Sequence, residues 1–368
     1  MPDNQGRVRY AVVGGGWISQ GAFMPGVGQT ENSVMTALVT GDPIKADALA
    51  KKYDLASYRY EDYDKLLASG TVDAVYIATP NFRHREFAEP ALKAGIHVLL
   101  EKPMECSVAD AQAIEDAAKA SGAKLMIAYR LHCEPGTLAL LQAIRDGAVG
   151  KPLFFSSDFS QNVKGSNHRA KSGYWAGPVP DMGTYPINAA RNLFGAEPVS
   201  VRAVGTRGGR DFGFDDTVAV TLEFPGERLA SFTVSYSGAD IDEFRVIGTD
   251  GTARCSPAFG FGEGTATTYT LTDKDGNESE HEAPVVDQFA GETAYFSDCI
   301  LNDREPEPNG EEGTLDVVVL EAVERALETG DTQKLEPRER RRRPVADQKR
   351  EFPLAKVPDF VNTDVPIG

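Results

Sequence analysis

A glycine turn near the N-terminus constrains this chain more than any other feature. Residues 8–13 read VRYAVV, which is typical of a buried strand, and they run directly into Gly14, Gly15 and Gly16. A helical pattern follows, with apolar residues at positions 18, 22 and 23. In a strand, turn and helix of this kind, glycines let a pyrophosphate approach the backbone and the helix N-terminus attracts the anion. We therefore predict a dinucleotide-binding turn.

The turn follows the GxGxxG pattern with one substitution. Gly14 and Gly16 take the first two glycine positions, and Ser19 stands where the third would be. Trp17 and Ile18 complete the stretch that we assign to the cofactor. The pattern alone is a weak signal, and an ordinary glycine turn is the alternative. Its location directly after a strand is the context that the fingerprint requires.

Composition narrows the class of protein. The length of 368 residues suggests about two domains, and the formal net charge of −17 disfavours nucleic acid and anionic membranes as partners. Four scattered cysteines show neither a CxxC pair nor metal-ligand spacing, so we predict no metal site and a reducing, cytoplasmic location. The first residues, MPDNQGRVRY, lack the features of a secretion signal, and no apolar run is long enough to span a membrane.

A second strand, residues 33–39, ends at the segment that distinguishes NAD from NADP. NAD-binding folds usually place a carboxylate here to bind the ribose 2′-OH, whereas NADP-binding folds leave room and positive charge. Gly41 stands at the expected carboxylate position, with the Thr40 hydroxyl and the Lys45 ammonium nearby. We therefore predict NADP. In the alternative, Thr40 is only a cap, Lys45 is solvated and Asp42 binds the ribose.

Strand and helix patterns alternate up to residue 128, which predicts an α/β fold with a doubly wound parallel sheet of the Rossmann type. One strand ends in Thr79, Pro80 and Asn81, and the next helix carries His84 in its first turn. Ligands bind at the carboxyl ends of parallel strands, so we expect these four residues to border the nicotinamide. In the alternative, Pro80 simply ends the strand and His84 is a surface residue.

The following strand, residues 96–100, leads into the segment EKPM, residues 101–104. The motifs VVGGGWISQ, YIATPN, EKPM and, in the second half, DMGTY resemble in order and spacing those of the glucose-fructose oxidoreductase and inositol dehydrogenase family (Gfo/Idh/MocA). The resemblance covers roughly residues 7–330. Three further segments, TGDPIKA, AYRLHCEP and NGEEGTLDV, look most like the glucose-fructose oxidoreductase branch and its NADP-dependent sugar dehydrogenase relatives.

This resemblance implies roles for three residues of the first half. Lys102, at the mouth of a strand beside the nicotinamide, would donate to the substrate oxygen and stabilise a developing alkoxide. Glu101 belongs to the same cofactor-binding segment, and Arg130 would lie where a guanidinium contacts phosphate or substrate hydroxyls. Without the other motifs, Glu101 and Lys102 would be interpreted as a surface ion pair.

The DMGTY segment supplies the predicted chemistry of the second half. Asp181 and Tyr185 are four residues apart, so on a helix both project from one face. The resemblance assigns proton transfer to Tyr185 and the orientation of sugar hydroxyls or of Lys102 to Asp181. A phenol titrates near pH ~10, and a cation such as Lys102 favours its phenolate. In the alternative, Asp181 is a helix N-cap and Tyr185 a half-buried helix residue.

The period changes from residue 153 onward to that of an open, mostly antiparallel sheet with one free face, which predicts an α+β domain. In the resembling proteins this face serves subunit association, which implies a homodimer or homotetramer. We place an NADP-binding domain at residues 1–130, a substrate and oligomerisation domain at 131–330 and an extended tail at 331–368. The basic run 338–343 has two interpretations: a patch that binds nucleic acid or membrane, or part of an arm that lies on a partner subunit or remains mobile. The acidic charge of the rest of the chain favours the arm.

Two segments ahead of DMGTY limit what can be transferred from the family. Many relatives carry GGGPL there, whereas this chain has YWAGPV at 174–179, so the loop that closes over the substrate should have a different shape. Upstream lies a basic segment that either contacts substrate or cofactor phosphate or is a solvated loop: Lys164, Asn167, His168, Arg169 and Lys171.

We therefore predict an NADP(H)-dependent oxidoreductase that interconverts a hydroxyl and a carbonyl on a sugar or similar polyol. Two alternatives stay open, namely a non-catalytic regulator that senses NADP(H) with the same fold and a reductase of non-sugar carbonyls or dihydrodiols. A sensor has no need of Lys102, Asp181 and Tyr185 together, which favours the enzyme.

Overall fold

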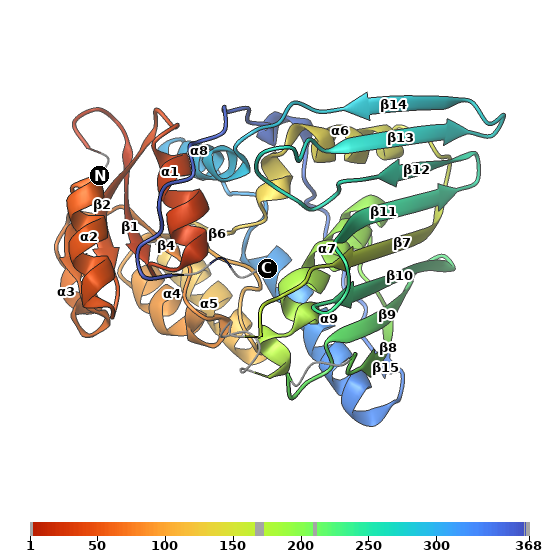
Figure 1. Cartoon of the computed structure of the whole chain (residues 1–368), viewed down its shortest axis with the longest axis horizontal. Coiled ribbons are helices and arrows are strands. Elements are labelled where there is room, and N and C mark those ends of the chain that lie inside the picture. The colour runs from red at the N-terminus through yellow and green to blue at the C-terminus, as the bar shows by residue number, and fades with distance from the viewer. Residues whose placement is uncertain (1–2, 166–172, 209–211, 364, 366–368) are drawn as a thin grey trace. The chain divides into compact units, whose positions relative to one another are not determined.

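The computed structural model describes residues 3–165, 173–208, 212–363 and 365, and its chain divides into two compact units. Unit 1 consists of Met1–Glu134, Val286–Thr314 and Arg350–Val365. Unit 2 consists of the described residues within Pro135–Val285 and Leu315–Lys349. Each unit is built on one sheet (Figure 1). Within the described ranges, no helix is both long and apolar enough to cross a membrane.

Unit 1 contains a parallel sheet of six strands in the order β3-β2-β1-β4-β5-β6. The strands are β1 (Val8–Val13), β2 (Ser33–Val39), β3 (Ala56–Tyr58), β4 (Ala74–Ile77), β5 (His97–Leu100) and β6 (Leu125–Ile127). Every residue of β4 and of β6 is buried, as expected of strands covered on both faces. The strand order reverses between β1 and β4, where dinucleotides bind in such sheets. The predicted Rossmann fold is confirmed, and the short β3 is an addition.

The helices of unit 1 connect these strands. They are a π-helical turn (Ser19–Phe23), α1 (Met24–Val27), α2 (Pro43–Tyr53), α3 (Tyr63–Leu67), α4 (His84–Lys93), α5 (Val108–Ser121) and α8 (Gln288–Leu301), with 3₁₀ turns at Tyr60–Asp62, Asn81–Arg83 and Arg130–Cys133. Helix α2 begins at Pro43, because the Asp42 carboxylate accepts from the Ile44 and Lys45 N–H groups and Pro43 takes the first helical position.

Two segments of unit 1 differ from the sequence-based boundaries, which place residues 286–314 in the second domain and 350–365 in the tail. Helix α8 buries Tyr295, Phe296 and Cys299 in the core of unit 1, together with strand residues such as Tyr10. The helix is apolar enough to pack on either domain, and sequence periodicity reports that a face is buried without saying against which neighbour.

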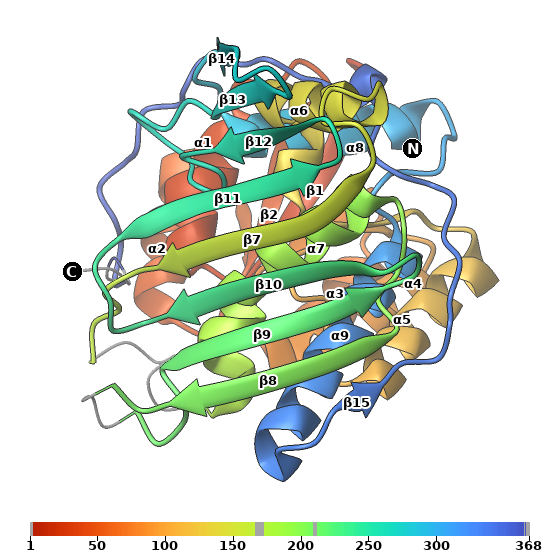
Figure 2. The ribbon, with the colours of Figure 1, turned by 90° about the vertical axis from the view of Figure 1, so that its right-hand side faces the viewer.

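Unit 2 contains a sheet of nine strands in the order β14-β13-β12-β11-β7-β10-β9-β8-β15, which Figure 2 views onto one face. The strands are β7 (Pro152–Ser160), β8 (Ser200–Thr206), β9 (Thr217–Phe224), β10 (Arg228–Ser235), β11 (Ile241–Gly248), β12 (Gly251–Cys255), β13 (Thr268–Asp273), β14 (Glu278–Glu282) and β15 (Gln333–Lys334). Only β7 and β10 pair in parallel, so the predicted mostly antiparallel sheet is confirmed. Strand β14 was not predictable from apolar alternation, because all of its residues are exposed.

The helices of unit 2 pack on this sheet. They are α6 (Pro135–Arg145), α7 (Thr184–Phe194), most of α9 (Gly310–Thr329) and a π-helical turn (Val179–Gly183), with 3₁₀ turns at Tyr174–Ala176 and Ala346–Gln348. A buried ionic cluster fastens α7, because the Arg191 guanidinium donates to both Glu197 and Asp316. Burying a pair of charges in this way requires that each keeps its partner.

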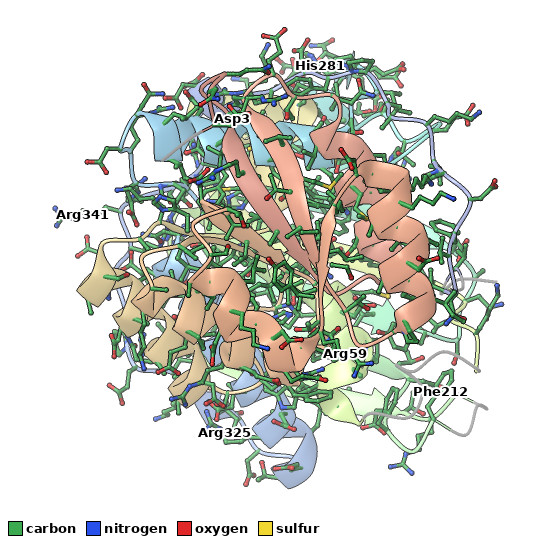
Figure 3. All side chains as sticks on the ribbon, turned by 90° about the vertical axis from the view of Figure 1, so that its left-hand side faces the viewer. Asp3, Arg59, Phe212, His281, Arg325 and Arg341 are labelled. Atoms are coloured by element: carbon green, nitrogen blue, oxygen red, sulfur yellow. The ribbon has the colours of Figure 1, made fainter. Side chains whose placement is uncertain are left out.

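The tail differs from the arm that the sequence suggests. Strand β15 adds to the edge of the unit 2 sheet beside β8, and Arg343 donates to the buried Glu197 at 2.7 Å. Arg340 is only 4% exposed, whereas Arg341 projects outward (Figure 3). The basic run is therefore partly incorporated into unit 2, and the charge pattern alone could not distinguish buried from solvated arginines.

Candidate functional site

The glycine turn after β1 has the geometry of an anion cradle. Gly14 has a φ of +99°, and a Cβ atom at this residue would lie 2.6 Å from the Ala78 carbonyl oxygen, so a side chain is excluded. A Cβ at Gly16, by contrast, would meet no atom within 4 Å. Open space above one glycine and close packing beneath another are what a pyrophosphate at this turn requires.

The start of the following helix stabilises the turn. Ser19, in place of a third glycine, is buried and donates from its hydroxyl to the Gly14 carbonyl at 2.6 Å. The Gln20 amide donates to the Gly15 carbonyl at 2.9 Å. Trp17 and Ile18 are half-buried, directly ahead of the π-helical turn. Such turns occur frequently at functional sites.

The segment after β2 contains the residues predicted to contact the ribose. A Cβ at Gly41 would lie 3.2 Å from the Tyr60 ring, so a larger side chain here requires the ring to move. The Asp42 carboxylate is committed, because Oδ1 accepts from the Ile44 and Lys45 N–H groups while Oδ2 accepts from the Asn362 amide at 2.5 Å. The Lys45 side chain lies beside Gly15 and Thr40, with its ammonium 3.9 Å from Asp42. Both oxygens of the Asp42 carboxylate therefore accept hydrogen bonds within unit 1.

The loop after β4 contains the four residues predicted to border the nicotinamide. Thr79 is buried beside Gly14, and its Oγ1 has no hydrogen-bond partner among the described residues. Pro80 is exposed and Asn81 half-buried. His84 differs from the expectation that it contacts the cofactor, because its two ring nitrogens face the Met104 and Thr79 carbonyls at 3.2 and 3.1 Å. It joins the loops after β4 and β5, and burial lowers the pKa of its imidazole to about 4.

Glu101 and Lys102 follow β5 at the same edge of the sheet. The Tyr76 hydroxyl donates to Glu101 Oε1 at 2.7 Å, and the Lys102 backbone N–H donates to Oε2 at 3.2 Å. Burial raises the pKa of the Glu101 carboxyl, which the neighbouring Lys102 charge partly opposes. The alternative interpretation was a surface ion pair between Glu101 and Lys102. The Glu101 carboxylate instead orients the backbone of the segment that carries Lys102.

Arg130 lies at the end of the β6 connection and is only 4% exposed. Its guanidinium donates to Gln288 at the start of α8 and lies 5.9 Å from the Phe289 ring centre. Burial raises the pKa of Glu292, one turn further along α8, well above its usual range, and the Arg130 charge opposes this shift. Arg130 is thus held within unit 1 by α8, a neighbour that the sequence had assigned to the other domain.

In unit 2, the DMGTY segment forms the π-helical turn that leads into α7. Tyr236, which is fully buried and directly follows β10, donates from its hydroxyl to Asp181 Oδ2 at 2.8 Å. Asp181 is therefore oriented by this tyrosine and is not a side-chain N-cap. Tyr185 is half-buried, with its ring centre 5.9 Å from that of Phe159 and 5.7 Å from that of Phe259. This arrangement presents a phenol and a carboxylate on consecutive turns.

The structure groups the predicted residues within each unit. Unit 1 holds the glycine turn, the segment after β2, the loop after β4, and Glu101, Lys102 and Arg130, while unit 2 holds Asp181 and Tyr185. Of the basic segment upstream, Lys164 is exposed, and residues 167, 168, 169 and 171 lie outside the described residues.

Three residues with a part in these sites were missed by the sequence interpretation: Gln20, Tyr60 and Tyr236. Gln20 lies inside the motif VVGGGWISQ, and its place in that motif is the one signal that points to it. Tyr60 and Tyr236 gave none, because nothing in the sequence pairs them with Gly41 or with Asp181, which precedes Tyr236 by 55 residues.

Comparison with known proteins matches both halves of the chain to one family. Residues 8–129 match the oxidoreductase family with an NAD-binding Rossmann fold, and residues 137–254 match the GFO/IDH/MocA C-terminal domain. A D-xylose 1-dehydrogenase [NADP(+)] of Haloarcula marismortui is 33% identical over 345 residues, which cover 89% of this chain and 93% of that protein. A trans-1,2-dihydrobenzene-1,2-diol dehydrogenase of Macaca fascicularis is 29% identical over 253 residues, covering 67% of this chain and 74% of that one.

Among solved structures, the aldose-aldose oxidoreductase from Caulobacter crescentus complexed with glycerol superposes with a TM-score of 0.83 at 34% identity, covering 89% of this chain and all of that one. The resemblance first read from four short motifs is thereby confirmed over most of the chain. This protein belongs to the GFO/IDH/MocA family of oxidoreductases, whose nucleotide-binding half is an NAD-binding Rossmann fold.

Proposed function

We propose that this protein is an NADP(H)-dependent oxidoreductase that interconverts a hydroxyl and a carbonyl on a sugar or related polyol. The choice of NADP over NAD is supported by the residues of the segment after β2. A site for NAD needs a carboxylate there for the ribose 2′-OH. Gly41 offers none, and the Asp42 carboxylate is occupied by two N–H groups of α2 and by Asn362. Lys45 and Thr40 are the groups left to receive a 2′-phosphate.

The residues of the glycine turn fit the remainder of a dinucleotide. Gly14 and Gly16 would hold the pyrophosphate, because one forms the turn and the other leaves its backbone accessible. NADP, when bound, supplies the hydride acceptor or donor at its nicotinamide ring. Thr79, Pro80 and Asn81, after β4, would border that ring.

The chain's own side chains would then manage the proton and the substrate. Tyr185 would accept the hydroxyl proton during oxidation and return it during reduction. The Lys102 ammonium would donate to the same oxygen and favour its developing negative charge. Asp181, fixed by Tyr236, would accept hydrogen bonds from neighbouring sugar hydroxyls. A purely binding protein of this fold would require none of these three.

The relatives support a sugar as substrate. The names of the Haloarcula and Caulobacter proteins specify xylose and aldoses, and both cover most of the chain at 33% and 34% identity. The relative that acts on a dihydrodiol matches a shorter part of the chain at 29% identity. We therefore infer that the enzyme oxidises an aldose and thereby reduces the cofactor. If the cofactor stays bound, a second aldose would accept the hydride and be reduced in the next half-reaction.

The test is a panel of aldoses, polyols and dihydrodiols assayed by absorbance of the reduced nicotinamide, with NADP⁺ and NAD⁺ in parallel. We expect aldose-dependent reduction of NADP⁺, and a lower dissociation constant for NADP⁺ than for NAD⁺. A mixture of two aldoses without added cofactor would reveal alternating turnover by formation of an aldonate and an alditol. Preference for NAD⁺ would refute the cofactor assignment, and activity on dihydrodiols alone would refute the sugar.

The open face of the unit 2 sheet supports a homo-oligomer. Phe154 on β7 stands in register with Leu229 on β10 and with Ile247 on β11, so the three side chains form one apolar row across the strands. Leu229 and Ile247 are 43% and 39% exposed, and Val204 on β8 is 70% exposed. We expect light scattering to give a dimer or tetramer that Leu229→Glu shifts toward monomer; a monomeric wild-type protein would contradict this proposal.

A further inference from the structure

The last described residues of the chain cross unit 1 without regular secondary structure, as the dark blue segment beside α1 in Figure 1. The Arg350 N–H donates to the Cys133 carbonyl, the Asp287 N–H donates to the Phe352 carbonyl, and the Ala355 N–H donates to the Asp287 carboxylate. These bonds fasten the segment to the 3₁₀ turn that ends at Cys133 and to Asp287, the N-cap of α8. Its continuation reaches the two regions that should hold a dinucleotide.

The first of these regions is the start of the helix after the glycine turn. The Gln20 side chain binds both backbone groups of one tail residue, because Gln20 Oε1 accepts from the Val361 N–H at 2.7 Å and Gln20 Nε2 donates to the Val361 carbonyl at 2.9 Å. The same Nε2 donates to the Gly15 carbonyl at 2.9 Å. One fully buried amide therefore joins the tail directly to the middle glycine of the turn.

Apolar contacts accompany these hydrogen bonds. The Phe360 ring lies on Gly21, where a Cβ atom would stand 3.1 Å from the ring, and Trp17 is beside the same glycine. Val361 is half-buried against the core of unit 1. The tail is thus packed at this point, whereas residues such as Val357, 60% exposed, lie outward between the attachment points.

The second region is the segment after β2. The Asn362 amide donates to Asp42 Oδ2 at 2.5 Å, while Asp42 Oδ1 caps α2. Asn362 has a φ of +46°, a left-handed conformation that asparagine adopts more readily than most residues. A carboxylate close to a 2′-phosphate repels it, and a donor on that carboxylate reduces the repulsion and holds it in its capping orientation.

We propose that Phe360–Asn362, here called the C-terminal clasp, are positioning residues of the NADP site. The clasp holds the glycine turn through Gln20 and holds Asp42 in its cap, so it slows release of the dinucleotide and favours the 2′-phosphate. This inference depends on the proposed function, because it assumes that NADP(H) occupies the turn. A purely structural tail would stabilise unit 1 without discriminating between NADP and NAD.

The experiment compares the full-length protein with three variants: a chain that ends at Asp359, Asn362→Asp, and the control Val357→Ala in the exposed part of the tail. Displacement of NADPH is followed by stopped-flow fluorescence, and the dissociation constants of NADP⁺ and NAD⁺ are measured by titration. Loss of several hydrogen bonds should raise the NADPH dissociation rate of the shortened chain roughly tenfold or more. Asn362→Asp, which sets one carboxylate against another, should weaken NADP⁺ binding several-fold relative to NAD⁺.

Each outcome of this experiment either supports or overturns the proposed role of the C-terminal clasp. Unchanged dissociation rates and an unchanged NADP⁺ to NAD⁺ ratio in both tail variants overturn the clasp, as does an equal effect of Val357→Ala. If the shortened chain does not fold, the preference ratio of Asn362→Asp decides alone, because folding stability does not alter that ratio. A wild-type protein that binds neither nucleotide overturns the proposed function and the clasp together, whereas wild-type binding with indifferent variants overturns only the clasp.

Discussion

The two candidate sites of this protein each adjoin a π-helical turn, but they are built by opposite means. The first site is the glycine turn after β1 in unit 1, and the second is the turn that carries Asp181 together with the start of α7 in unit 2. The first presents main-chain groups, so its requirement is the absence of side chains at Gly14 and Gly16. The second presents the side chains of Asp181 and Tyr185. A substitution in a site made of backbone disrupts it by steric clash or backbone strain. A substitution in a site made of side chains disrupts it by removing a chemical group.

The supports of the two turns differ accordingly. Around the first, Ser19 and Gln20 donate to the carbonyls of Gly14 and Gly15, which fixes the backbone itself. Around the second, Tyr236 donates to the Asp181 carboxylate, which fixes a side chain that the backbone leaves free to rotate. Substitutions around the glycine turn should therefore alter folding and cofactor binding, and substitutions around Asp181 and Tyr185 should alter turnover.

The largest effect is expected for Tyr185→Phe. If the phenol moves the substrate proton, turnover should fall roughly 10²–10⁴-fold, the usual contribution of a general acid or base. The ring contacts with Phe159 and Phe259 remain possible for phenylalanine, so the fold should persist. Turnover and NADP⁺ titration on the same preparation check this. Turnover within threefold of wild type would remove the acid/base role of Tyr185, and a matching loss of NADP⁺ affinity would reassign it to binding.

Gly14→Ala and Gly16→Ala sharpen the comparison within the first turn. At Gly14 the φ of +99° and the 2.6 Å approach to Ala78 O should lower the free energy of unfolding by about 2–6 kcal/mol, from strain and overpacking together. At Gly16 nothing lies within 4 Å, so stability should be unchanged or slightly raised, while the methyl group takes space that the pyrophosphate needs. Urea unfolding and NADP⁺ titration separate the two. Equal destabilisation by both substitutions would contradict the steric account.

Patterns that depend on neighbours in the sequence were predictable, and those that depend on distant partners were not. Gly14 and Gly16 follow a strand directly, and the apolar runs of β1, β2 and β4 are local, so the Rossmann sheet and its turn could be predicted. The capping role of Asp42 was in principle readable from Asp42 and Pro43, since a helix often starts this way.

The contacts that attach the tail to unit 1 could not be predicted from local sequence patterns. The Val361 backbone meets Gln20 at a separation of 341 residues, and an amide that binds a backbone leaves no signature in the tail sequence. For the same reason α8 could be predicted as a helix but not assigned to unit 1. The roles proposed for Asp181 and Tyr185 depend on the family resemblance, because four-residue spacing occurs on every helix and identifies no chemistry alone.

The pH dependence of the free energy of unfolding tests whether His84 is a buried, neutral residue in unit 1. Burial lowers the pKa of His84 to about 4, below the value of about 6.5 expected in the unfolded chain. Between these values the unfolded chain binds a proton that the folded chain does not, so the free energy of unfolding falls as the pH falls. From pH 7 to pH 5 the loss is about 2 kcal/mol.

His84→Gln removes this titration and should flatten that part of the profile, even though it also loses a contact to the Thr79 or Met104 carbonyl. Buried carboxyls such as Glu101, whose pKa is raised by burial, stabilise the fold on acidification and affect both proteins alike. Urea unfolding at pH 7 and pH 5 gives the comparison. An identical pH slope in wild type and variant would show that His84 takes up its proton as readily in the folded protein as in the unfolded chain.

The smallest effect is expected for Tyr236→Phe, which tests whether the unit 2 site needs its support. The Tyr236 hydroxyl donates to Asp181 at 2.8 Å and faces the Ala176 and Gly177 carbonyls at 3.1 and 3.2 Å. Its loss lets the Asp181 carboxylate rotate, so kcat/KM for the sugar should fall about tenfold, in line with one hydrogen bond to a charged group. The matched control is Tyr174→Phe, since Tyr174 is also a tyrosine of unit 2 but donates to the Leu320 carbonyl. If both substitutions lower stability alike and neither changes kcat/KM, Asp181 is held by the backbone of its turn, and the contrast between the two sites is weaker than their hydrogen bonds indicate.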